Sequence, residues 1–279
     1  MKEKLLIPAS VLISLVLITA SFFYRSGANL EEKNQAVSFD GGFVLPVVWD
    51  DMASELAETG VIDEEKFRAL YAARGGMSKE IENLFTESGD LVITPENSGE
   101  VLNLLWAFGL ANKNPVLENG PMVDPRYGGP GGFASTGGWS LARGNVAEHY
   151  SAHAFVALSE EQQRLVGRVS KNIYRPCCNN STYFPDCNHG MAMLGLLELM
   201  AENGLSEDEM YRVALRVNSL WFSDTYQTIA AYLDSKGKSI EAADPKEILG
   251  ASFSSYSGFS RILAEFTPPE GVGGAGCGV

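Results

Sequence analysis

The chain has 279 residues, of which 45% are hydrophobic and 20% charged, a balance typical of a folded globular protein and too apolar for wholesale disorder. Its formal net charge of −14 opposes binding to phosphate backbones and anionic membrane surfaces, and no cluster of lysine and arginine offsets that charge. We therefore expect no nucleic-acid partner.

Residues 1–24 predict an N-terminal membrane anchor. A basic start precedes a run without charges, 5–23, which at about 1.5 Å per residue nearly spans a hydrocarbon core of about 30 Å. The positive side stays in the cytoplasm, so the rest of the chain is expected on the periplasmic or cell-surface side. A cleaved signal peptide is the alternative, with Ser26-Gly27-Ala28 as the cleavage site. A polar linker, 25–42, follows the anchor.

The region 43–267 predicts a single, mainly α-helical globular domain with many helices. Helical periodicity begins at Phe43. Further helices are expected after Ser78 and from Thr94-Pro95, because a capping residue precedes the helical pattern at both places. Only Leu91–Ile93 resembles a strand.

The second half of this region is punctuated by a long connection and by helix caps. The glycine- and proline-rich stretch 112–140 is expected to be an irregular surface connection. Capping boxes at Ser159–Gln162 and Ser206–Glu209 predict two helix starts. The stretch 190–204 is apolar nearly all round, which predicts a helix buried on all sides at the centre of the fold.

The segment RPCCNNSTYFPDCNHGMAM, residues 175–193, contains three of the four cysteines. Four of its side chains form a three-sulfur, one-nitrogen set of candidate metal ligands: Cys177, Cys178, Cys187 and His189. Such a set suits Cu(I) or tetrahedral zinc. Met193 follows His189 by four residues and shares its helix face, so it adds a thioether that favours copper over zinc.

Three further residues are reserve candidates for the same metal. His149 and His153 form an H-x-x-x-H pair, which on a helix presents two imidazoles on one face, and a helical hairpin would bring them near the cysteines. Cys277 lies in the glycine-rich tail 268–279, where a flexible arm can carry it to the site as a fourth ligand or a resolving thiol.

The cysteine segment resembles the core of extracytoplasmic bacterial proteins that carry the PCYCGC motif. The matching residues are Pro176-Cys177, Cys178 and Asp186-Cys187, and the predicted anchor fits the same family. The C-Y-C-G-C cluster of the family is reduced here to two adjacent cysteines, and the resemblance covers about 35 residues of the chain. It implies a cysteine-based metal or redox role and no particular substrate.

These patterns predict a membrane-anchored, extracytoplasmic protein that binds, stores or transfers a soft metal ion together with a metal-exchange partner protein. An enzyme is the less favoured interpretation, because a catalytic metal needs an open coordination position that the pattern does not indicate. Two alternatives stay open. One is thiol–disulfide exchange with a partner protein. The other is a structural or interaction domain clamped by a disulfide from Cys187 to Cys177 or Cys178, which would contribute about 2–3 kcal/mol.

Overall fold

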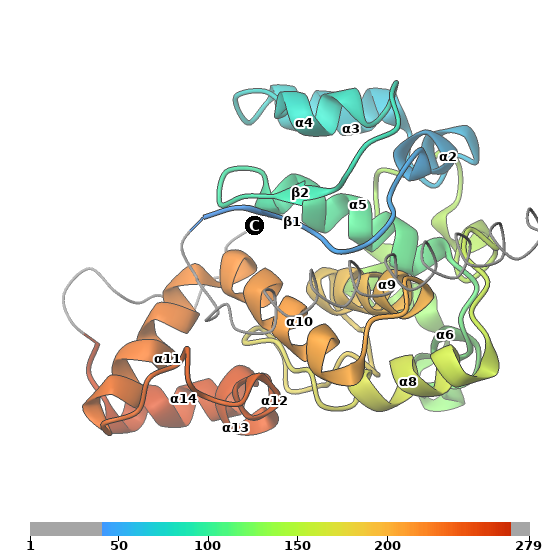
Figure 1. Ribbon diagram of the computed structural model, residues 1–279. Coiled ribbons are helices and arrows are strands. Elements are labelled where there is room, and N and C mark those ends of the chain that lie inside the picture. Colours follow the sequence, from blue (N-terminus) through green and yellow to red (C-terminus); the bar gives the residue numbers. More distant parts are fainter. Residues whose placement is uncertain (1–40, 269–279) are drawn as a thin grey trace, which may run out of the picture. The chain divides into compact units, whose positions relative to one another are not determined.

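The computed structural model describes residues 41–268, which form the mainly helical body that the sequence predicts (Figure 1). The predicted anchor 1–24, the linker up to residue 40 and the tail from residue 269, with Cys277, lie outside the described residues. Between residues 41 and 268, no helix is both long and apolar enough to cross a membrane.

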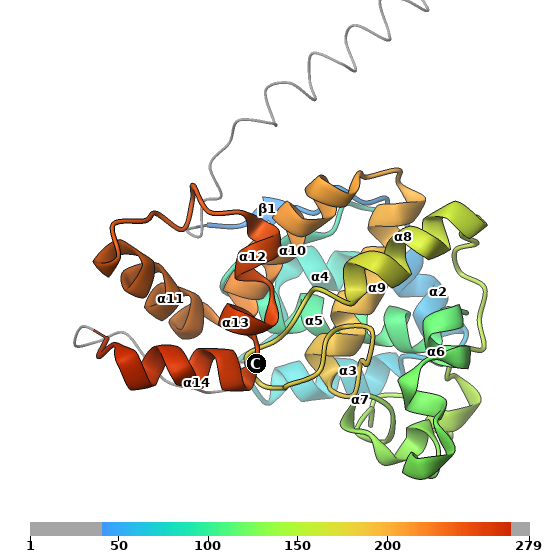
Figure 2. The same ribbon diagram turned by 90° about the horizontal axis from the view of Figure 1, so that it is seen from below.

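Two long helices, α5 (Ser98–Ala111) and α9 (Asn188–Glu202), pack against each other in the middle of this body (Figures 1 and 2). Glycine allows their backbones to approach closely, since a Cβ on Gly109 would lie 2.3 Å from the carbonyl oxygen of Met191. Every residue from His189 to Ala201 is buried, which confirms the predicted central helix.

The other helices surround this pair. α8 (Glu160–Ser170) and α10 (Glu207–Trp221) pack against α9. Near the N-terminal end of the described chain lie α2 (Met52–Glu58), α3 (Glu64–Ala72) and α4 (Lys79–Asn83). Four helices gather at one end of the body in both views (Figures 1 and 2): α11 (Ser223–Ser235), α12 (Pro245–Ile248), α13 (Ala251–Ser254) and α14 (Tyr256–Glu265).

The predicted start of the helical region at Phe43 is wrong. Residues of β1 (Phe43–Val44) pair with β2 (Val92–Ile93) as antiparallel strands, with Phe43 opposite Ile93. The backbone N–H of Leu45 then donates to the carbonyl of Leu91 at 2.9 Å, so the chain stays extended and α2 begins only at Met52. Pairing with a distant segment therefore overrides the local helical pattern.

Three of the four predicted helix starts are confirmed and one is wrong: α4 follows Ser78 as expected. Both capping boxes, at Ser159 and Ser206, are complete, with reciprocal bonds between the cap and the third helical residue. The helix expected from Thr94-Pro95 begins at Ser98 instead, because the side chain of Asn97 accepts from the backbone N–H of Thr94 and holds a turn there.

The stretch 112–140 is more ordered than expected. It contains α6 (Pro115–Asn119), α7 (Ala134–Gly137) and three short 3₁₀ turns: Pro121–Val123, Pro125–Tyr127 and Pro130–Gly132. The backbone N–H of Ser135 donates to the carbonyl of Asp186 at 3.1 Å. This connection therefore packs against the cysteine segment.

Candidate metal centre

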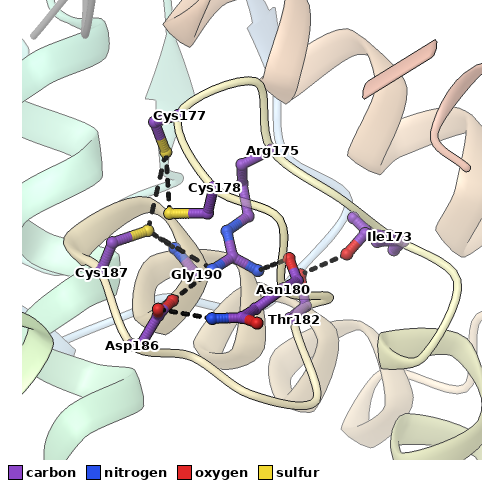
Figure 3. A network of polar contacts seen from close by, with 9 residues as sticks. All are labelled: Ile173, Arg175, Cys177, Cys178, Asn180, Thr182, Asp186, Cys187 and Gly190. Carbon is purple, nitrogen blue, oxygen red and sulfur yellow. Dashed lines mark hydrogen bonds and ion pairs between the residues drawn. The ribbon is translucent and has the colours of Figure 1, made fainter. Parts of the chain in front are cut away.

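The cysteine segment is a folded loop between α8 and α9. The backbone N–H and the hydroxyl of Thr182 both donate to the carbonyl oxygen of Ile173, at 2.8 and 3.1 Å, and these bonds close the loop upon itself (Figure 3). Cys187 is the N-cap of α9, and its sulfur accepts from the backbone N–H of Gly190 at 3.4 Å. The closed loop brings Cys177 and Cys178 to the start of α9, as Figure 3 shows.

The three sulfur atoms lie together at this helix start. Cys177 Sγ is 3.4 Å from Cys178 Sγ and 3.7 Å from Cys187 Sγ. Four ligands in a tetrahedron with a zinc–sulfur distance of about 2.3 Å leave neighbouring sulfurs about 3.8 Å apart. The spacing therefore suits a shared metal ion, and the thiols are free in this structure.

His189 lies beside two of the three sulfurs, those of Cys177 and Cys187, and is not grouped with Cys178. One of its ring nitrogens lies within 4.8 Å of the sulfurs of Cys177 and Cys187. The ring is fully buried beside Trp221 and Phe222, at centroid distances of 5.9 and 4.4 Å. Neither ring nitrogen has a hydrogen-bond partner among the described residues. A buried polar group without a partner lowers stability by about 1–3 kcal/mol, and a metal ion would supply that partner.

Arg175 and Asp186 lie beneath the sulfurs and were not predicted as site residues. The Arg175 side chain has no exposed surface. Its Nη2 donates to Asp186 Oδ1 at 2.9 Å and to Cys187 Sγ at 3.5 Å, and its Nη1 donates to the carbonyl of Asn180 at 2.9 Å (Figure 3). A Cβ on Gly190 would lie 2.7 Å from Nη2, so glycine is required where α9 covers the guanidinium.

The electrostatics of the cluster distinguish the three thiols. Contacts from the two other thiols, followed by the positive charge of Arg175, hold the pKa of Cys187 well below its ordinary value, and the nearby imidazole of His189 acts in the same direction. Contacts with the other two sulfurs and burial raise the pKa of Cys177. The pKa of Cys178 is lowered by the contact with Cys177. The contact with Cys187 and burial outweigh this and raise the pKa of Cys178 to about 12. The cluster thus favours one thiolate, at Cys187.

The reserve histidines lie elsewhere. The expected α-helix for this pair is wrong, because the chain forms a 3₁₀ turn at Val146–Glu148 and then a bridge between His153 and Asn112. His149 Nδ1 and His153 Nε2 still meet at 3.1 Å. Among the described residues, the groups of candidate ligands around Cys187 contain neither histidine.

Two further candidates, Met193 and Cys277, were predicted from the sequence, whereas Asp186, which is grouped with two of the sulfurs, was not. Met193 is fully buried in α9, one helical turn after His189. Cys277 lies outside the described residues. Asp186 groups with Cys178 and Cys187 within 4.8 Å, and its position directly before Cys187 was the signal that could have identified it.

No protein-family model matches this chain, and no match is found among curated proteins or solved structures. The resemblance to PCYCGC-motif proteins therefore stays a prediction.

Proposed function

We propose that this protein binds a soft metal ion at a centre formed by Cys177, Cys178, Cys187 and His189, for metal binding, storage or transfer. The observation that carries the proposal is the fully buried imidazole of His189, which has no hydrogen-bond partner within residues 41–268 and lies beside the sulfurs of Cys177 and Cys187. We further propose that residues 1–24 anchor the protein to a membrane and that the centre acts on the extracytoplasmic side, with a metal-exchange partner protein.

The surroundings of the sulfurs support a metal–thiolate centre. Ligands are commonly held in place by outer hydrogen bonds, and Cys187 Sγ receives two, from Gly190 N–H and from Arg175 Nη2. The buried guanidinium also offsets the negative charge that several bound thiolates would bring into the interior.

Copper is the first candidate and zinc the second. Soft thiolate ligands select Cu(I), and three of the four proposed ligands are cysteine sulfurs. Charge balance favours zinc, because three thiolates leave one negative charge with Zn²⁺ and two with Cu(I), and the single cation of Arg175 is already shared with Asp186. The two ions therefore have to be compared directly.

The test is elemental analysis of the full-length protein, purified without a metal-affinity tag under aerobic and anaerobic conditions. We expect about one copper or zinc ion per chain. Cys187→Ser is expected to lose the ion, whereas His153→Gln, which removes an imidazole outside the sulfur cluster, is expected to retain it. Absence of stoichiometric metal under both conditions contradicts the proposal.

Thiol–disulfide exchange is the second candidate, and one specific observation favours it. Cys187 combines a lowered pKa with a position at the start of a fifteen-residue helix, and Cys177 Sγ lies 3.7 Å away. In this reaction the Cys187 thiolate attacks a protein disulfide and releases one partner thiolate. The Cys177 thiolate then attacks the Cys187 sulfur of the mixed disulfide, which releases the second partner thiolate and leaves Cys177 and Cys187 joined.

Thiol counting and a redox titration separate the two candidates. Exchange predicts metal-free protein with one accessible, reactive thiol at neutral pH and a two-electron transition that Cys177→Ser abolishes. A metal centre instead predicts thiols that become reactive only after chelation. Unreactive cysteines in the metal-free protein contradict exchange.

A further inference from the structure

A pocket of about 200 Å³ lies beside the metal centre but is not part of it. Its walls come from the end of α3, from α5, from the turn at residues 138–141 and from Asn188, the first residue of α9. None of the three clustered cysteines lines it, and neither does His189. The lining of this pocket therefore has a chemistry of its own.

Two indole rings form a fixed aromatic wall in this pocket. Trp106 and Trp139 pack edge to face, with ring centroids 4.8 Å apart. Their N–H groups donate to the backbone carbonyls of Ser135 and Val61, at 2.6 and 2.8 Å. Both rings are thereby locked. Trp106, which is half-buried, offers a ligand an apolar edge rather than a donor, and the buried Trp139 holds it in place from behind.

The polar groups of the pocket have unused hydrogen-bonding capacity. The side chain of Asn103 donates to the Tyr71 hydroxyl at 2.6 Å, and within residues 41–268 its carbonyl oxygen makes no hydrogen bond. The side chains of Ser140 and Asn188 make no hydrogen bond within the same part of the chain. All three can therefore turn toward a ligand.

Arg74 gives the pocket its charge preference. Its guanidinium lies 6.0 Å from the ring centroid of Tyr71, and no carboxylate of the described residues forms an ion pair with it. Arg74 is therefore an exposed cation beside apolar walls, in a protein whose net charge of −14 otherwise opposes anions. The planar fork of arginine matches a carboxylate through two parallel hydrogen bonds.

We propose that this pocket binds a small organic carboxylate with a flat apolar body. The carboxylate would pair with Arg74, and the body would lie against Trp106, with the buried Trp139 behind it. The volume of about 200 Å³ is below the about 300–1,000 Å³ of pockets for drug-sized ligands, so the ligand must be about as small as phenylacetate. This inference does not depend on the metal centre.

The test is a titration of the full-length protein with phenylacetate, followed by tryptophan fluorescence and by calorimetry. We expect saturable binding, with a fluorescence change because two of the four tryptophans line the pocket. Phenylacetamide, which has the same shape without the charge, is expected to bind at least tenfold more weakly. Arg74→Gln is expected to weaken phenylacetate binding at least tenfold.

Arg261→Gln is the matched control, because Arg261 is an exposed arginine on α14 outside the pocket. It is expected to bind phenylacetate as the wild-type protein does. Three outcomes overturn the proposal: no saturable binding up to about 10 mM, equal binding of phenylacetate and phenylacetamide, or unchanged affinity in Arg74→Gln. Since Arg74 is exposed, its replacement is not expected to prevent folding, and circular dichroism of each variant checks this.

Discussion

The guanidinium of Arg175 lies 3.5 Å from the sulfur of Cys187, and no part of the arginine is exposed to solvent. A buried cation is stable only when it is paired and hydrogen-bonded, and Arg175 has Asp186 as a second partner at 2.9 Å. The site therefore contains a positive charge that favours a thiolate at Cys187 before any ligand arrives.

Replacing this cation should change the reactivity of one thiol. In Arg175→Met we expect the pKa of Cys187 to rise, because the favourable interaction of the guanidinium with the thiolate is lost. The measurement is the pH dependence of Cys187 alkylation, followed by peptide mass spectrometry in metal-free protein. Arg175→Lys keeps the charge and should give a smaller shift. Identical pH profiles for all three proteins would show that the arginine has no electrostatic effect on the thiol.

Gly190 should be intolerant of the smallest side chain. The Cβ of Gly190→Ala would lie 2.7 Å from Arg175 Nη2, and the guanidinium cannot move away because Asp186 and Asn180 hold it. We expect a loss of about 1–3 kcal/mol in the free energy of unfolding, measured in urea.

The control for this substitution is Gly167→Ala on α8, where an added Cβ meets nothing within 4 Å. Alanine has the higher helix propensity, so this variant should gain up to about 1 kcal/mol. Equal effects at the two positions would mean that the contact with Arg175 is not tight.

Local sequence signals predicted the parts of the fold that depend on neighbouring residues. The capping boxes at Ser159 and Ser206 satisfy their own helix ends, and the apolar run of α9 requires a buried position whatever surrounds it. The proximity of Cys177, Cys187 and His189 was also foreseeable, because they are close in sequence and a turn separates them.

Features that depend on distant segments were not predicted. Phe43 forms a strand only because Ile93, fifty residues away, supplies its partner. The two reserve histidines meet through a 3₁₀ turn and a bridge to Asn112, which no helical spacing indicates. The role of Arg175 becomes visible only when the loop closes over it, since a lone arginine in a sequence gives no sign of burial.

Glu198 should make the stability of the protein depend on pH. Burial raises its pKa well above the ordinary value of 4.5, although a hydrogen bond from Asn112 at 2.5 Å opposes this. The folded state therefore holds this proton more tightly than the unfolded state. The contribution of this proton to the free energy of unfolding is fully present below about pH 4.5. It is lost as the pH rises from there through the raised pKa of Glu198 in the folded state.

Glu198→Gln removes this titration, so its free energy of unfolding should fall less than that of the wild-type protein between pH 5 and pH 8. Urea unfolding at both values measures the difference. Glu202→Gln, an exposed position on the same helix, should behave as the wild-type protein does. A parallel fall in Glu198→Gln and the wild-type protein would mean that Glu198 is not the group responsible.

His189 allows the metal proposal to be separated from a structural role. In metal-free protein, His189→Leu replaces a buried imidazole, which has no hydrogen-bond partner among the described residues, by an apolar side chain. The free energy of unfolding should therefore stay equal or rise by about 1 kcal/mol. With metal present the result should reverse. A ligand at 100 times its Kd stabilises the folded state by about 2.7 kcal/mol, and the variant should lose most of this gain.

Thermal unfolding in chelator, in Zn²⁺ and in Cu(I) under anaerobic conditions measures both effects at once. His153→Gln is the matched control, because it removes a histidine that is not grouped with Cys187 and should keep the gain in Tm. A large loss of stability in chelator, combined with an unchanged gain from metal, would assign His189 to packing against Trp221 and Phe222. Unchanged stability in chelator, combined with a lost gain from metal, would assign the imidazole nitrogen as a ligand, because a packing role does not depend on the metal.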